Sequence, residues 1–146
     1  TFVTADDFFP TNLATSGATP MGEAILEGIR LCQGRKDEYK AAGISYYRPW
    51  IWLITDGAPT DDVSAAKEAI AKGEKQGEFS FWAVGVEGAD MDLLNELSVA
   101  RPVPKLTGLS FRELFAWLSS SLKVVSRSHP GDDIPLPAPT GWATFS

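Results

Sequence analysis

Blocks of apolar and polar positions alternate along the chain and predict strands and helices in turn. The run WIWLI at residues 50–54 places apolar side chains on both faces of a strand, which is typical of a parallel strand covered by helices. A second such run, FSFWAVGV, occupies residues 79–86, and the proline-containing PVPKL at residues 102–106 suits the edge of a sheet. This alternation favours an α/β fold with a mostly parallel sheet flanked by helices.

Helical periodicity predicts the elements between these strands. Residues 20–42 form the first helix, with Pro20 in its first turn and Gly43 just past its end. Its predicted inner stripe is Met21, Ile25, Gly28, Ile29 and Cys32. Further helices are expected at about residues 62–76 and over MDLLNELS, residues 91–98.

The last helix begins at Ser110, which forms a capping-box pattern with Glu113. Six side chains at 3.6-residue spacing are expected to be buried beneath it: Phe111, Leu114, Phe115, Leu118, Leu122 and Val125. The proline-rich end is expected to form an extended tail, pinned by Ile134, Leu136 and Trp142.

Composition narrows the class of protein. The 146 residues are 44% hydrophobic and suffice for one ordinary domain. The net charge of -6 excludes the basic footprint of a nucleic-acid binder and disfavours an anionic membrane surface. Because Cys32 is the only cysteine, no internal disulfide can form, which favours a reducing compartment, and we expect a cytoplasmic protein. Cys32 lies on the inner stripe of the first predicted helix and is therefore expected to be a buried core thiol. His129, in the tail, is expected to be solvated or locally capping.

The predicted strands are few for a sheet buried on both faces. Three runs and a strand stub at residues 1–4 compare with about five to six strands in a typical sheet. The strand at residues 50–54 therefore lacks a neighbour on one side. Either the sheet is unusually small, or its first strands lie outside this chain.

Two oxygen-bearing side chains converge on the carboxyl edge of the predicted sheet, where ligands bind in open parallel sheets. Asp56 follows the strand in WLITDG, and Thr19 precedes the first helix in SGATPMGEA. A hydroxyl and a carboxylate without a nearby histidine or cysteine suit Mg²⁺ or Mn²⁺ and do not suit zinc.

Each of these residues also has a purely structural interpretation. Thr19 could cap the first helix with Pro20 as its first residue, and Asp56 before Gly57 could be a turn residue. Asp61 and Asp62 fit the N-terminus of the following helix, where its dipole stabilises acids. Spacing alone favours these interpretations over a metal site.

The two motifs resemble those of the von Willebrand factor A (vWA) domain family. SGATPMGEAI resembles the threonine motif of that family's metal-ion-dependent adhesion site, and WLITDGAPTD resembles its aspartate motif. The strand FWAVGV, the ending FRELFAWLSSSL and the tail are similar to a bacterial subgroup linked with tellurium-resistance and stress operons. The resemblance implies a Rossmann-like sheet that carries one divalent ion, with Thr19 as a direct ligand and Asp56 as a direct or water-mediated one.

The same resemblance implies a docking module that is not an enzyme, in which a protein partner supplies a carboxylate to the Mg²⁺ or Mn²⁺ ion. The family's D-x-S-x-S motif is missing; the nearest string, DVSAA from Asp62, lacks the second serine and lies beyond the aspartate motif. Compared with the family's pattern, residues 1–128 correspond to a partial vWA domain and residues 129–146 to the tail. The first two strands of the family's sheet, its first helix and most of its third strand are expected to be missing. We expect such a chain to need the missing N-terminal segment, or another copy of itself, against its first strand.

A Mg²⁺-dependent phosphoryl-transfer or hydrolytic enzyme on a similar sheet is the alternative. It would require a nucleophile or base and a phosphate cradle. The sequence has no G-x-x-x-x-G-K-[ST] loop and carries its single histidine in the tail. The docking function is therefore the prediction that we favour.

Overall fold

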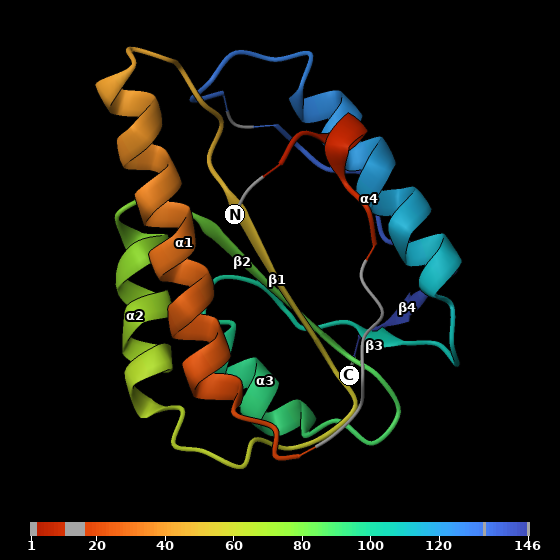
Figure 1. Cartoon of the computed structure of the whole chain (residues 1–146). Helices are drawn as coiled ribbons and strands as arrows, with labels where there is room; N and C mark the ends of the chain where they lie inside the picture. Colours follow the sequence, from red (N-terminus) through yellow and green to blue (C-terminus); the bar gives the residue numbers. More distant parts are fainter. Residues whose placement is uncertain (1–2, 11–16, 133, 146) are drawn as a thin grey trace.

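The computed structural model describes residues 3–10, 17–132 and 134–145 and has an α/β architecture (Figure 1). The helices are the 3₁₀ helix η1 (Ala5–Asp7), α1 (Met21–Ala41), α2 (Ser64–Lys75), α3 (Met91–Leu97) and α4 (Phe111–Val125). The strands are β1 (Trp50–Thr55), β2 (Ser80–Gly85), β3 (Lys105–Leu106) and β4 (Ala143–Thr144). The first helix, two long strands and last helix expected from the sequence are confirmed. Of the predicted stub, residues 1–2 lie outside the described ranges, and Val3 and Thr4 form no strand.

The four strands form one sheet in the order β1-β2-β3-β4. β1 runs parallel to β2 in a register that pairs Trp52 with Trp82, β2 runs parallel to β3, and β4 is antiparallel to β3. Among the described strands β1 is therefore an edge strand and is only half-buried, whereas β2 is almost fully buried. In the described chain β2 is the one neighbour of β1, which confirms the expectation that this strand lacks a partner on one side.

Helices cover both faces of the sheet (Figure 1). On one face, α1, α2 and α3 pack against the inner side chains of β2, with Ile25, Ile70 and Leu97 among the buried residues. On the other face, α4 places Leu114 over Val84 and Leu106. Each such fully buried side chain contributes about 1.5–3 kcal/mol. In the described part of the chain, no helix combines the length and the apolar character that a bilayer crossing needs.

The tail packs into the hydrophobic core on the face of the sheet that α4 covers. Trp142 is 2% exposed, which confirms that it pins the tail, and Ala143–Thr144 adds a strand beyond β3. The prediction that the 102–106 segment lies at a sheet edge is therefore wrong: β4 covers its outer side. The Trp117 indole N–H also donates to the Pro137 carbonyl, at 2.9 Å, and so ties the tail to α4.

Two expectations for α4 are wrong. Ser110 makes no side-chain cap, because its hydroxyl instead donates to the Thr107 carbonyl at 2.7 Å. Phe115 and Leu122 are 52% and 47% exposed, so the buried stripe is narrower than six residues. Only one helix covers this face in the described chain, which leaves the flank of α4 without a partner to bury these two side chains.

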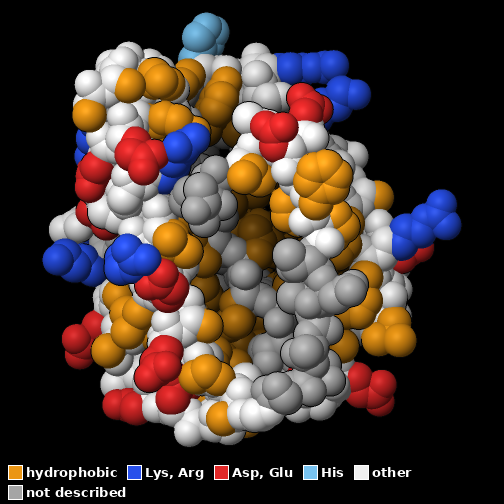
Figure 2. All heavy atoms as spheres, viewed as in Figure 1, with side chains coloured by type: hydrophobic (Ala, Val, Ile, Leu, Met, Phe, Trp, Pro, Cys, Tyr) orange, Lys and Arg blue, Asp and Glu red, His pale blue; other side chains and the backbone are white. Residues whose placement is uncertain are grey.

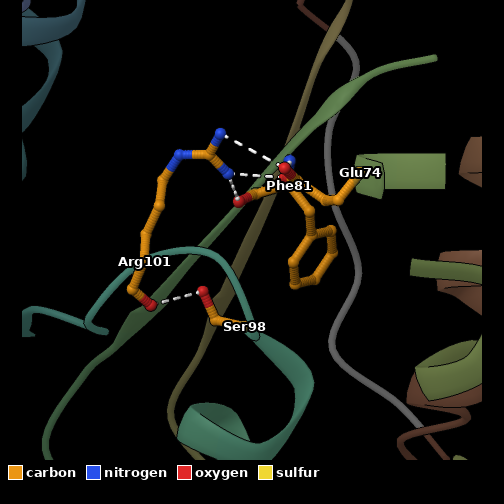
Figure 3. A network of polar contacts seen from close by, with 4 residues as sticks. All are labelled: Glu74, Phe81, Ser98 and Arg101. Atoms are coloured by element: carbon orange, nitrogen blue, oxygen red, sulfur yellow. Dashed lines mark hydrogen bonds and ion pairs between the residues drawn. The ribbon is translucent and has the colours of Figure 1, made fainter. Parts of the chain in front are cut away.

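A buried polar network fixes the contact between α2, β2 and the segment before β3 (Figure 3). The Glu74 carboxylate, 8% exposed at its side chain, accepts hydrogen bonds from the Phe81 backbone N–H and the Arg101 guanidinium. Arg101 also donates to the Phe81 carbonyl at 2.8 Å and lies over the Trp82 ring at 4.6 Å. Both carboxylate oxygens of Glu74 therefore accept a hydrogen bond, as a buried carboxylate requires.

Candidate functional site

Thr19 and Asp56 lie at the same end of the molecule. Asp56 directly follows β1, and Thr19 lies in the segment that enters α1, whose N-terminus is at that end of the sheet (Figure 1). The Thr60 backbone N–H donates to the Thr19 carbonyl at 3.0 Å and joins the two loops. The structure thus brings together the two segments that carry the predicted ligands.

Asp61 makes the second link between these loops. Its carboxylate accepts hydrogen bonds from the backbone N–H groups of Gly22, at 3.1 Å, and Glu23, at 2.9 Å. These bonds, the one from Glu23 first, hold the pKa of Asp61 below its usual value. Asp61 therefore caps α1 and not the helix that follows it, so its predicted place at the N-terminus of α2 is wrong. Sequence spacing could not reveal this role, because the residues joined are 38 and 39 positions apart.

Asp62 behaves as the sequence predicted. Its carboxylate accepts hydrogen bonds from the Ser64 backbone N–H, at 2.9 Å, and from the Ser64 hydroxyl, at 2.7 Å, at the start of α2. The bond from the Ser64 side chain is the main cause that lowers the pKa of Asp62. On the neighbouring loop, Asp90 caps α3 by accepting from the Leu93 N–H at 3.0 Å.

The Asp56 carboxylate differs from these three. Asp56 is exposed, and no hydrogen bond or ion pair with another described residue engages its side chain. Its backbone is closely held: an added Cβ at Gly88, whose φ is +96°, would lie 2.8 Å from the Asp56 carbonyl oxygen. Asp56 therefore lies against the loop that carries Gly88 and leaves its carboxylate open to a ligand.

The capping interpretation of Thr19 is wrong. Pro20 occupies the N-cap position of α1, and no side chain provides a capping hydrogen bond at that position. Asp61 supplies the acceptor for the first N–H groups of α1 instead. The exposed Thr19 hydroxyl is left outside the capping arrangement.

The donor set at this edge fits a hard cation only in part. Thr19 and Asp56 offer a neutral oxygen and a charged oxygen, which is the chemistry that Mg²⁺ prefers. Asp61, Asp62 and Asp90 are already committed to backbone donors, and no group of three metal-ligating His, Cys, Asp or Glu side chains occurs among the described residues. Two donors alone leave most of an octahedral shell to water or to other molecules.

Two other predicted residues lie away from this edge. Cys32 is half-buried rather than in the core, and partial burial raises the pKa of its thiol. His129 is 94% exposed at its side chain, with Nδ1 3.7 Å from the Asp132 carboxylate, which confirms the expected solvated position.

A cleft that no sequence pattern predicted opens at the opposite end of the sheet. Its volume is about 610 Å³, and its lining includes Arg48, Trp50, Ser80, Trp82 and Leu136. These residues come from the amino ends of β1 and β2 and from the tail, which the periodicity did not place near them. The cleft is thus separate from the Asp56 edge.

The fold defines a class only: an α/β protein with a small, mostly parallel sheet and an open carboxylate at its carboxyl edge. Comparison of the chain with models of known protein families, with curated proteins and with solved structures gave no match.

Proposed function

We propose that this chain is a protein-interaction module of the vWA type, which binds Mg²⁺ or Mn²⁺ at Thr19 and Asp56 and docks a carboxylate of a protein partner on the ion. The observation that supports the proposal most is the contrast between Asp56 and its neighbours. Asp61, Asp62 and Asp90 all bind backbone N–H groups, whereas no described residue engages the Asp56 carboxylate. The motif resemblance points to the same residue.

The chemistry of such a site follows from its donors. Because the Thr19 hydroxyl is neutral, Asp56 alone offsets one of the two positive charges of the ion, so an external carboxylate is attracted to it. The remaining ligands would come from water and from a second polypeptide segment beside β1. That segment would be one that carries the D-x-S-x-S motif. A bacterial stress or tellurium-resistance system in the cytoplasm is the setting that the resemblance suggests.

Titration of the chain with Mn²⁺, followed by the paramagnetic resonance signal of the free ion, tests the metal site. We expect weak binding that Asp56→Asn and Thr19→Ala each abolish, with the far-ultraviolet dichroism unchanged. Asp92→Asn removes an exposed carboxylate from the N-terminal turn of α3 and serves as the matched control.

A short aspartate-containing peptide then tests docking. The peptide is expected to bind the Mn²⁺-loaded chain and to lose that binding with chelator or with Asp56→Asn. Peptide binding that survives chelation would contradict the proposal, as would turnover of a phosphoester that depends on Asp56.

A further inference from the structure

The outer edge of β1 carries backbone groups without a strand partner. The Ser80 N–H donates to the Pro49 carbonyl and the Val86 N–H to the Thr55 carbonyl, so odd-numbered residues of this strand direct their backbone groups toward β2. By the alternation of a β-ladder, Trp50, Trp52 and Ile54 direct their N–H and C=O groups away from the sheet. No other strand of the described chain pairs with them.

The described residues of this edge strand include neither of two residue types that normally prevent pairing, lysine and proline. Natural sheets protect their edges with lysine, proline, a bulge or a covering element, yet Trp50–Thr55 contains no charge and no proline. Ile54 is 36% exposed, and the other five residues of the strand are only partly buried. Figure 2 shows hydrophobic side chains in the hollow that runs down this face of the molecule.

The charges at the two ends of the strand are complementary under a two-fold rotation. Arg48 precedes the strand and Asp56 follows it. Neither side chain has a hydrogen bond or ion pair with a described residue. The Arg48 guanidinium lies beside Gly77, and because this side chain is exposed it can turn outward to meet a partner strand. If two strands pair antiparallel with Trp52 opposite its own copy, then Trp50 lies opposite Ile54 and Arg48 lies opposite Asp56. Both charges are then neutralised at both ends of the contact.

We propose that the occupant of this edge is a second copy of the chain, paired antiparallel through β1 in this register. Each directly opposed pair among Trp50, Trp52 and Ile54 exchanges two backbone hydrogen bonds, giving about six in all. The tryptophans of both copies lie on the same face, where Trp52 already stacks on Trp82 with ring centroids 5.3 Å apart. The contact is isologous, so it closes as a dimer and extends no further.

Sedimentation velocity and light scattering on the full chain in chelator test the dimer. We expect a particle of twice the 15.8 kDa chain mass. Ile54→Pro removes one outward N–H without touching the ladder to β2, because proline is tolerated where that N–H faces solvent. This variant should be monomeric and folded, whereas the matched control Ile54→Val keeps the N–H and should remain dimeric.

Charge reversal tests the register. Arg48→Glu and Asp56→Arg each place two like-charged pairs across the contact and should weaken dimerisation about tenfold or more. The double variant Arg48→Glu/Asp56→Arg should return to within about threefold of the parent. An equimolar mixture of the two single variants should form a heterodimer, because every opposed pair then has opposite charge.

Three results would overturn the proposal. One is a folded parent chain that is monomeric at all concentrations. Another is a dimer that Ile54→Pro and both charge reversals leave unchanged. The third is a chain that is folded only with a different polypeptide bound at β1, since the occupant would then not be a second copy.

Discussion

Asp61 joins two loops through hydrogen bonds to the backbone of α1, and its contribution should depend on pH. Because the folded-state pKa lies below the unfolded value of about 3.9, the stabilisation is present above that value and is lost as pH falls through the folded-state pKa. Asp61→Asn should therefore lower the urea midpoint at pH 7 and make little difference in strong acid. Glu68→Gln, which removes an exposed charge of α2 without a described partner, is the control; equal effects of both variants would contradict the capping role.

Gly88 gives a second prediction at the scale of the residue. Gly88→Ala combines a positive φ with a Cβ only 2.8 Å from the Asp56 carbonyl oxygen, so we expect a loss of about 1–3 kcal/mol in unfolding free energy. Gly131→Ala introduces the same kind of φ, +101°, with no atom within 4 Å, and isolates the backbone cost. Denaturant titration should show the larger loss for Gly88→Ala; equal losses would mean that the Asp56 loop moves away freely.

At the scale of elements, the Glu74–Arg101 pair should be a main connection between α2 and the segment before β3 (Figure 3). Arg101→Met leaves a carboxylate that is 8% exposed with the Phe81 N–H alone, so we expect a loss of about 3 kcal/mol by urea unfolding. The exposed pair Lys67–Glu96 is the control, since Lys67→Met should cost less than about 1 kcal/mol. Glu74→Gln in the Arg101→Met background should recover part of the loss, because the uncompensated charge is then gone.

The elements were largely predictable because apolar periodicity is local. Residues 20–42 and 79–86 gave α1 and β2 to within a residue or two, since each pattern is bounded by turn-forming residues. The pairing of strands depends on residues far apart in the chain, and the predicted edge position of the 102–106 segment was wrong for this reason. The pairing of β4 with β3 depends on residues nearly forty positions apart, and it made an interior strand of a proline-flanked segment.

The candidate site shows the same division. Its two residues could be found from motif spacing, and the loops that carry them do meet. The capping of α1 by Asp61 and the cleft at Arg48 depend on contacts between residues far apart in the chain. Such contacts leave no local pattern in the sequence.

At the scale of the whole molecule, the two proposals share one carboxylate, and this has a measurable consequence. In the β1-paired dimer Asp56 faces Arg48 of the other copy, so a divalent ion can use Asp56 fully only in the monomer. A ligand that prefers one state shifts the equilibrium toward that state, and the coupling is reciprocal. Adding Mg²⁺ should therefore raise the monomer fraction in sedimentation experiments.

Ionic strength must be matched with KCl, because salt alone screens the Arg48–Asp56 attraction. Asp56→Asn should dimerise more weakly than the parent and show no further response to Mg²⁺ beyond that of KCl. A parent dimer whose dissociation constant is the same in Mg²⁺ and in matched KCl would show that Asp56 does not serve both contacts. In that case the edge contact and the metal site are independent, and each depends on its own test.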